Sequence, residues 1–334
     1  MFACWRVERV LLVVGLLAAC ASGARAEVMA LALERLSAGD CAGTLTAPAV
    51  LRSGEGPALT PDREAWRALV SELSGALAAH PLGPVIGSGP RGFELALETN
   101  VTDIDAGARA WRRGTRGRGV RTCAGENDAV RPVLVSNRLR VDKGLPLGAT
   151  LGASVGRLRA TGSYLVGAAL KLALLEDALG GNLPDLALRG ALTSLVGEPS
   201  LTLFVITADA LISDRFVVAQ QIVLAPFAGA GAVWTRARTE AVDLTPNIDA
   251  EACALGSDPR CAGASDDDLA HDVQFASLSL LRYRVFGGVS ARYRFAALAL
   301  SASADLLPPG LGELGRGPTT RRQWTLSVAP SLTF

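Results

Sequence analysis

From residue 92 to the end of the chain, hydrophobic residues alternate with small or polar ones. In the first such segment, Phe93, Leu95 and Leu97 fall on one face, and glutamates and small residues fall on the other. A period of two is typical of a β-strand whose two faces meet different surroundings. The pattern predicts an all-β fold of about ten strands, within a range of roughly eight to twelve. The predicted strands are 92–102, 132–142, 145–157, 163–175, 184–196, 199–209, 216–235, 272–284, 286–301 and 321–334.

The connections between these strands alternate in length. The long ones, 103–131, 236–271 and 302–320, are the first, seventh and ninth, whereas the even-numbered connections are short. Bacterial outer-membrane barrels have an even number of antiparallel strands, with long extracellular loops on one side and short periplasmic turns on the other. Closing the sheet leaves no unpaired edge in lipid. We therefore predict a transmembrane antiparallel β-barrel over 92–334, with the N- and C-termini of the mature chain in the periplasm.

The last predicted strand has the clearest alternation and ends on an aromatic residue. It resembles the C-terminal signal of bacterial outer-membrane barrels, which the barrel-assembly machinery reads. An amphipathic edge strand of a periplasmic sandwich would show the same alternation and is the alternative. The residues predicted to form the assembly signal are Trp324, Leu326, Val328, Leu332 and Phe334.

The N-terminal segment, 1–26, has the three parts of a secretory signal peptide. Arg6 and Arg9 precede an apolar run from Val10 to Ala19, and Ala24-Arg25-Ala26 matches the small-x-small cleavage pattern. The apolar run is short for a membrane-spanning helix. Leu17-Ala18-Ala19-Cys20 also resembles a lipobox, in which Cys20 would be lipidated. Both interpretations predict export from the cytoplasm.

Residues 27–91 show a helical period instead of a strand period. Trp66, Leu69 and Leu73 recur at helical spacing, and Thr60-Pro61-Asp62 has the composition of a helix start. We predict an amphipathic helix over 61–79, between proline-rich flanks. The predicted organisation is thus a signal peptide, 1–26, a periplasmic leader with one helix, 27–91, and a barrel, 92–334. The leader is either free in the periplasm or a plug for the barrel.

Composition agrees with a chain embedded in a membrane. The protein is 49% hydrophobic and 19% charged, with a net charge of +1 and 36 glycines, and its mean hydropathy is +0.30. The charge balance excludes a global nucleic-acid-binding surface. The long uncharged run 216–235 has the length of a spanning helix, but Gln220, Gln221 and Pro226 favour a strand.

Charged residues of the predicted strands fall on the face opposite the apolar one. Charge facing lipid costs about 2–4 kcal/mol at the bilayer centre, so the charged face should line the lumen. We expect Glu94 and Glu98 to pair with arginines of the neighbouring strand and to neutralise part of a basic interior. A salt-bridged, filled interior and a cation-lined conduit are both compatible with the pattern. The predicted lumen-facing charged residues are Glu94, Glu98, Arg138, Arg140, Lys171, Arg189, Arg292 and Arg294.

The cysteines beyond the signal peptide indicate an oxidising compartment. Cys253 and Cys261 lie in one predicted loop and are the disulfide candidates. Cys41 and Cys123 would be either a second pair or free thiols. A pair would require the leader to reach the extracellular side through the barrel.

Candidate catalytic and metal-binding groups are few. The two histidines are His80 and His271, and neither belongs to a helical metal-binding or hydrolase motif. The stretch Gly152–Gly156 matches the letters of a nucleophile elbow but lies inside a strand pattern. We predict no catalytic residues, no metal and no cofactor, and hence no enzyme. Arginines of the first long loop, Arg112 and Arg113 among them, could clamp lipopolysaccharide phosphates or simply be solvated.

Several stretches resemble an uncharacterised group of proteobacterial, and especially myxobacterial, outer-membrane β-barrel proteins. They are Arg140–Pro146, Leu170–Glu176, Leu183–Gly190 and Ala225–Gly231. The resemblance covers roughly 60–334 and implies fold and location but no activity. The chain departs from the pattern at Leu211–Phe216, which makes strand pairing there doubtful.

These observations predict an outer-membrane barrel that passes small solutes in the manner of a porin. The alternative is a structural or surface-interaction barrel with a blocked lumen. The expected partners are outer-membrane lipid, including lipopolysaccharide, and the barrel-assembly machinery, but no nucleic acid.

Overall fold

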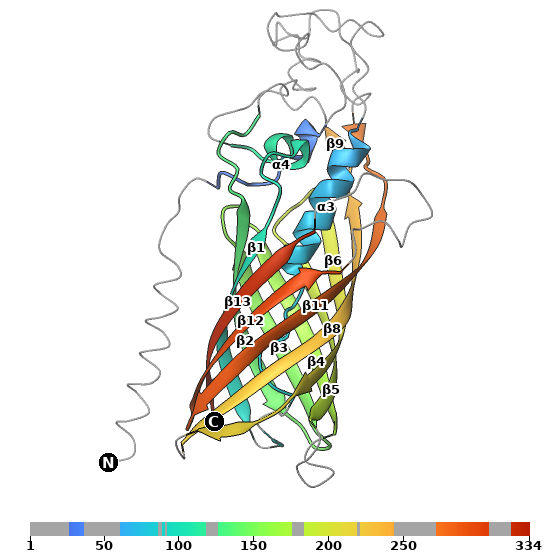
Figure 1. Ribbon diagram of the computed structural model, residues 1–334. Helices are drawn as coiled ribbons and strands as arrows, with labels where there is room; N and C mark the ends of the chain where they lie inside the picture. The colour runs from blue at the N-terminus through green and yellow to red at the C-terminus, as the bar shows by residue number, and fades with distance from the viewer. Residues whose placement is uncertain are drawn as a thin grey trace, which may run out of the picture.

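The computed structural model describes residues 27–36, 61–85, 89–90, 92–117, 126–175, 184–218, 221–243, 272–306 and 322–334. Its main sheet is a closed antiparallel barrel, because each barrel strand pairs with the next one and the last pairs with the first (Figure 1). The predicted ten-stranded transmembrane barrel is thereby confirmed. Its strands are β1 (Phe93–Asp103), β2 (Val133–Gly144), β3 (Ala149–Leu158), β4 (Tyr164–Leu175), β5 (Asp185–Val196), β6 (Leu201–Ser213), β8 (Ile222–Thr239), β11 (Leu278–Tyr293), β12 (Ala296–Asp305) and β13 (Trp324–Thr333).

Short strands and helices lie at the two ends of the barrel. The three-residue strand β7 (Phe216–Val218) folds against the start of β8. At the other end, β9 (Val242–Asp243) and β10 (Asp272–Val273) pair with each other. The helices are α3 (Arg63–Leu77), α4 (Arg109–Arg113) and the 3-10 turn η1 (Leu33–Arg35).

One predicted turn is wrong. Val285, expected between two strands, lies in the middle of β11 and pairs with Ala230 and Ala304. The turn instead lies at Arg294 and Phe295. Gly287 and Gly288 interrupt the hydrophobic pattern because they carry no side chain to mark a face. Gly288 is needed for packing, since a Cβ there would lie 2.6 Å from the Phe227 ring and 2.3 Å from the Leu300 carbonyl oxygen.

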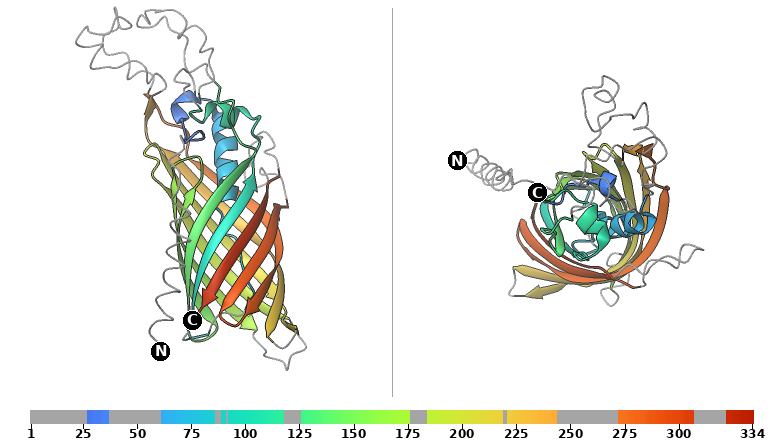
Figure 2. Two further views of the ribbon diagram at one scale, coloured as in Figure 1. Left: turned by 90° about the vertical axis from the view of Figure 1, so that its left-hand side faces the viewer. Right: turned by 90° about the horizontal axis from the view of Figure 1, so that it is seen from above.

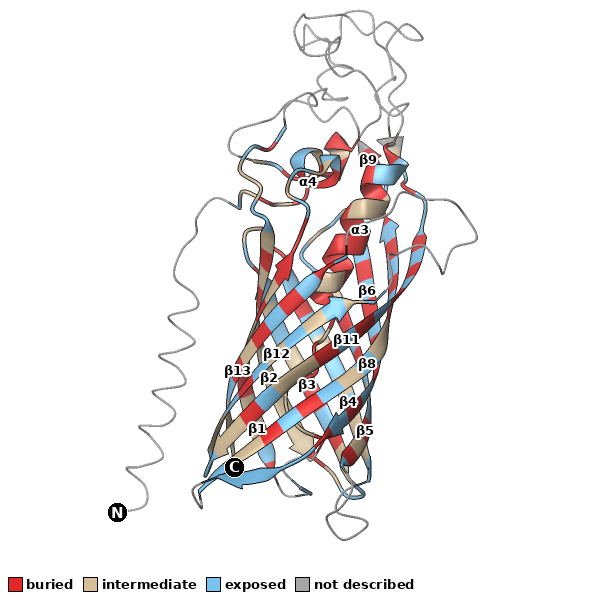
Figure 3. Ribbon diagram, in the orientation of Figure 1, coloured by how far each residue is buried: buried red, intermediate tan, exposed pale blue. Residues whose placement is uncertain are grey.

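Exposed and buried residues alternate along the barrel strands (Figure 3). The exposed ones are largely apolar, and exposed aromatic residues lie near both ends of the strands. Leucine and valine side chains cover the band between the rings. Aromatic rings at both membrane interfaces are typical of transmembrane barrels. Near the long connections the ring consists of Tyr164, Phe204, Trp234, Tyr283 and Trp324, and at the opposite end of Phe93, Phe216, Tyr293, Phe295 and Phe334.

Helix α3 enters the barrel from the end that carries the long connections, and its lower part lies inside the ring of strands (Figure 2). Its start is capped by Asp62, whose carboxylate accepts a hydrogen bond of 3.0 Å from the amide of Ala65. Trp66, Leu69 and Leu73 are fully buried. They belong to one hydrophobic cluster with inward-facing residues of the barrel wall, such as Leu134 and Leu203. The upper half of the lumen is therefore a packed core.

The described N-terminal segment and the C-terminus lie at opposite ends of the barrel. The amide of Met29 donates to the carbonyl of Ala160, beyond the end of β3, whereas Phe334 exchanges backbone hydrogen bonds with Phe93 at the start of β1. The prediction that both ends face the periplasm is therefore wrong. The reason is that the chain enters through the end with the long connections, crosses the lumen through 78–85, and begins β1 at the far end.

Candidate functional site in the barrel lumen

Three arginines of the barrel wall surround the C-terminal end of α3; we call them the arginine collar. Arg138 on β2 donates to the carbonyl of Leu77 at 2.7 Å. Arg189 on β5 and Arg284 on β11 donate to the carbonyl of Ala79 at 3.0 and 2.9 Å. The last carbonyls of a helix lack partners within the helix and carry partial negative charge, which nearby cations stabilise. The collar therefore holds the buried end of α3 at mid-lumen.

Asp209 on β6 compensates the charge of the collar. Its carboxylate contacts Arg189 at 3.1 Å and Arg284 at 2.8 Å, and the residue is 3% exposed. Buried cations are tolerated where counter-charges and hydrogen bonds surround them. Asp209 and the carbonyls of Leu77, the last residue of α3, and of Ala79, two residues further on, together supply both.

A second group of hydrogen bonds holds the middle of α3. Arg282 on β11 is 2% exposed and donates to the carbonyl of Ser71 at 2.5 Å and to the side-chain oxygen of Gln323 at 2.7 Å. It also forms an ion pair with Asp305 on β12. Gln323 in turn donates to the carbonyls of Glu72 and Asp103, at 3.0 Å each. This network joins the helix to β1, β11 and the β12–β13 seam.

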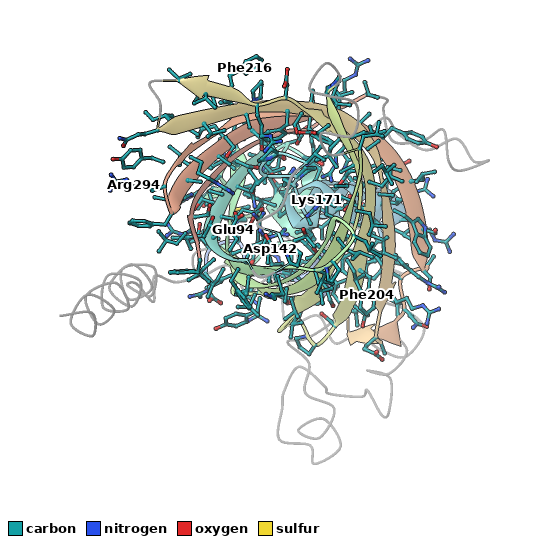
Figure 4. All side chains as sticks on the ribbon, turned by 90° about the horizontal axis from the view of Figure 1, so that it is seen from below. Glu94, Asp142, Lys171, Phe204, Phe216 and Arg294 are labelled. Carbon is teal, nitrogen blue, oxygen red and sulfur yellow. The ribbon has the colours of Figure 1, made fainter. Side chains whose placement is uncertain are left out.

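Below the collar, acidic and basic side chains project into the remaining lumen (Figure 4). Arg140 pairs with Asp142 at 2.8 Å, with Glu94 at 3.5 Å and with Glu98 at 3.8 Å. Lys171 donates to the carbonyl of Pro84 at 3.0 Å and so holds the segment that follows α3. The expected pairing between the first two strands is present, but all three of these acids converge on Arg140.

Little space remains between the plug and the wall. Three cavities along the described part of the lumen have volumes of about 20, 50 and 40 Å³. Volumes of this size hold one or a few water molecules. None of these three cavities has room for a solute of the size of a sugar.

Most of the predicted lumen-facing residues line the interior. Glu98 and Arg138 are buried, and Glu94, Arg140, Lys171, Arg189 and Arg292 are partly buried along the lumen. The prediction that Arg294 faces the lumen is wrong, because this residue lies in the β11–β12 turn with a φ of 53°. Its guanidinium is exposed outside the barrel, 5.3 Å from the centroid of the Tyr293 ring. The misplaced turn at Val285 explains the error.

Several interior charged residues among the described ones were missed. Arg282 and Arg284 share the inward phase of Leu278 and Leu280, and this phase could have identified them before the glycine pair broke the pattern. Asp209 stood at the very end of a predicted strand, so its face was not assigned. The carboxylates of Asp142 and Asp305, which pair with Arg140 and Arg282, were missed as well.

Other predicted site residues have mixed outcomes. Trp324, Leu326 and Phe334 are exposed on the outer face, and Val328 and Leu332 are partly buried in the same phase. Their role in assembly stays a prediction. Cys253 and Cys261, like Cys41, Cys123 and His271, lie outside the described residues.

Two titratable groups of the plug have shifted pKa values. Burial raises the pKa of Glu72, although hydrogen bonds from Trp111 at 2.5 Å and from the amide of Asp105 at 3.0 Å oppose the shift. Burial, together with the cationic Arg284, Arg138 and Arg189, lowers the pKa of His80 well below its usual value. His80 is therefore neutral at neutral pH and adds no further positive charge beside the collar.

The first long loop uses its arginines to build the mouth of the barrel. Arg109 pairs with Asp62 at 3.0 Å, and Arg112 pairs with Glu126 at 2.7 Å. Arg35 is buried and donates to the carbonyl of Thr115 at 2.7 Å. These contacts favour a structural role for this cluster over a phosphate clamp.

The described residues show no metal site or hydrolase elbow. Across these parts of the chain, no group of three or more His, Cys, Asp or Glu side chains could hold a metal ion. Gly152–Gly156 lies within the regular strand β3, away from any strand-to-helix turn. Among the described helices, none combines the length and the apolar character that a membrane span requires.

The closed antiparallel sheet, the apolar outer band between two aromatic rings, and the interior filled by the chain itself define a transmembrane β-barrel with an internal plug. Comparisons with protein-family models and with curated proteins find no match.

Among solved structures, the chain is similar to three bacterial barrels. The N-terminal β-barrel domain of Pseudomonas aeruginosa OprF shares 13% identity, with 74% of this chain and 99% of that chain covered and a TM-score of 0.27. Neisserial surface protein A shares 12% identity, with 72% of this chain and 97% of that chain covered and a TM-score of 0.28. The KdgM porin in complex with disordered oligogalacturonate shares 7% identity, with 72% of this chain and 99% of that chain covered and a TM-score of 0.28. At such low scores, the assignment of the fold rests on the strand pairing of this chain alone.

Proposed function

We propose that the protein is an outer-membrane barrel whose lumen is closed by its own N-terminal segment, and that it acts as a structural or surface-interaction barrel instead of an open channel. The observation that carries the proposal is the seating of α3 on the arginine collar, at the bottom of an apolar upper lumen. An antiparallel barrel with this outer face belongs in the outer membrane of a Gram-negative bacterium, with lipid and the barrel-assembly machinery as its partners. The proposal includes no catalytic activity, cofactor or nucleic-acid partner.

The interior of the barrel supports a permanent plug. Water-filled porin lumens are polar, whereas Leu203, Val205 and Val233 face inward here and are buried against the helix. Without α3 these side chains would be exposed to water. At about 25 cal/mol for each Å² of apolar surface, that exposure would strongly disfavour an empty lumen.

A small-solute channel is the second candidate. It is favoured by the cationic side chains that remain below the plug, among them Arg140, Lys171 and Arg292. Passage would require α3 and the following segment to leave the lumen. A channel formed in that way would prefer anions, because the collar arginines would lose their carbonyl partners at Leu77 and Ala79.

The two candidates are separated by planar-bilayer conductance of the full mature barrel and of a Leu69→Glu/Leu73→Glu variant. Both leucines are fully buried in the plug, so two unpaired carboxylates there should expel α3 while leaving the strand pairing intact. We expect no steady conductance from the wild type and anion-selective conductance from the variant. Arg63→Glu, at an exposed position of the same helix, is the control and should stay closed. Steady conductance from the wild type would favour the channel.

A further inference from the structure

A groove on the outer face of the barrel is not used by the plug or the lumen. It has a volume of about 370 Å³ and lies across β5, β6 and β8, near the end that carries the long connections. Its apolar part is formed by Leu192, Ile206 and Trp234, which are 43%, 40% and 39% exposed. The indole nitrogen of Trp234 donates to Ser279 at 2.8 Å, which fixes the orientation of the ring.

The upper part of the groove carries two arginines. Arg236 pairs in register with Phe204 and Ser279, and Arg238 with Thr202. Both side chains are exposed, and among the described residues neither has an ion-pair partner. Glu240, which is also exposed, follows two residues after Arg238.

Two other outward-facing arginines have acidic partners. Arg157 pairs with Glu27 at 2.6 Å, and Arg215 lies 3.8 Å from Asp185. Arg236 and Arg238 therefore carry positive charges that no acidic side chain among the described residues pairs with. A pair of exposed guanidinium groups is suited to phosphate, which accepts several charge-assisted hydrogen bonds at once.

The position of the arginines along β8 indicates the source of the phosphate. At about 3.4 Å for each residue, they lie roughly 7 and 14 Å beyond Trp234 along the strand. Trp234 belongs to the aromatic ring that marks the edge of the apolar band. Charge on the lipid-facing surface is tolerated near the interface, where lipid headgroups lie. The arginines are thus at headgroup level, and the apolar part of the groove is at acyl-chain level.

We infer that this groove binds a phosphorylated glycolipid of the outer leaflet, with a phosphate on Arg236 and Arg238 and an acyl chain along Leu192, Ile206 and Trp234. The inference rests on the proposed location in the outer membrane, where the long connections face outward and phosphorylated lipid A forms the outer leaflet. The groove combines an apolar channel with a cationic end, and this lipid has the complementary arrangement of chain and charge.

The test uses the full mature barrel folded in neutral detergent, and native mass spectrometry with purified bisphosphorylated lipid A or its dephosphorylated form. The double variant Arg236→Gln/Arg238→Gln should bind the phosphorylated lipid about tenfold or more weakly than the wild type, because charge-assisted hydrogen bonds are lost. Its binding of the dephosphorylated lipid should be unchanged. Arg294→Gln, an exposed arginine at the opposite end of the barrel, is the matched control and should bind like the wild type.

Each outcome decides the inference. Equal affinity of the wild type for the two lipids, or equal affinity of wild type and double variant for the phosphorylated one, would overturn it. Displacement of the lipid by millimolar inorganic phosphate would overturn recognition of a lipid, and persistence of the complex would support it. Heat-dependent migration on gels shows that each variant is folded. Cell fractionation tests the outer-membrane location separately, so a failure of the proposed function is distinct from a failure of the groove.

Discussion

At the scale of single residues, Asp209 is the most consequential side chain of the lumen. It contacts Arg189 and Arg284 and allows both to reach the end of α3. Sequence reasoning predicted a charged lumen and most of its members, because charge and strand phase are both local properties. It could not predict Asp209 as the counter-charge, since the partners are 20 and 75 positions away in the chain.

Asp209→Asn should lower the stability of the barrel by about 3–5 kcal/mol, because it leaves two buried guanidinium groups without a counter-charge. The measurement is the midpoint of urea unfolding, followed by heat-dependent migration on gels. Asp128→Asn removes an exposed carboxylate and should change the midpoint little. An equal effect of the two variants would show that Asp209 does not balance the collar.

The pH dependence of the plug should depend on His80. Its pKa is lowered by burial and by the collar arginines, so the unfolded plug binds a proton at a higher pH than the folded one. The resulting stability is fully present above the usual pKa of about 6.5 and is lost as the pH falls from there toward the lowered folded value.

Proteolysis of 61–85 in folded barrels should therefore become faster below about pH 6.5. His80→Gln should remove that part of the pH dependence while the contribution of Glu72 remains. An unchanged pH profile in the variant would contradict this account.

At the scale of elements, the strands were predictable and their ends were not. The period of two is repeated over enough residues to define ten strands, whereas turns depend on a few positions. In the β11–β12 hairpin, Gly287 and Gly288 resemble a turn in sequence but lie in the strand, where Phe227 packs against Gly288. The seventh predicted strand, 216–235, likewise divides into β7 and β8.

The closing strand β13 should be required for assembly. Deletion of Phe334 removes an aromatic side chain that is 63% exposed and backbone hydrogen bonds to Phe93 across the seam. We expect unassembled periplasmic protein that no longer shows heat-dependent migration. Phe216→Ser alters an exposed aromatic residue at the same end but on β7, away from the seam, and should assemble normally. Normal assembly without Phe334 would argue against the signal.

At the scale of the whole molecule, the plug could be anticipated only as an alternative. Helical spacing predicted α3, but the spacing cannot say where a helix lies. One signal was present in the sequence: around Leu203 to Ile206, both faces of the strand are apolar, which a polar lumen would not need. The inward face of this stretch belongs to one hydrophobic cluster with α3, and the outward face is exposed on the apolar outer surface.

If the end with the long connections faces outward, as proposed, the path of the chain places residues 27–36 outside the cell. Glu27 lies beside Arg157, beyond the opposite end of the barrel from Phe334. In the proposed orientation, an epitope tag placed before Glu27 of the mature chain should be detected by antibody on intact cells. A tag after Phe334 should be detected only after the outer membrane is permeabilised. The reverse pattern would contradict the orientation.

The same path through the lumen has a mechanical consequence. In the proposed orientation, a load applied to residues 27–36 from outside the cell passes along the chain to α3 and reaches β1 only from the far end of the barrel. It is resisted first by the contacts of 27–36 at the mouth, such as that of Met29 with Ala160, then by Arg282 on Ser71, and last by the guanidinium contacts to Leu77 and Ala79. In that orientation, tension that reaches the end of α3 is spread over β2, β5 and β11 before it reaches the seam between β1 and β13.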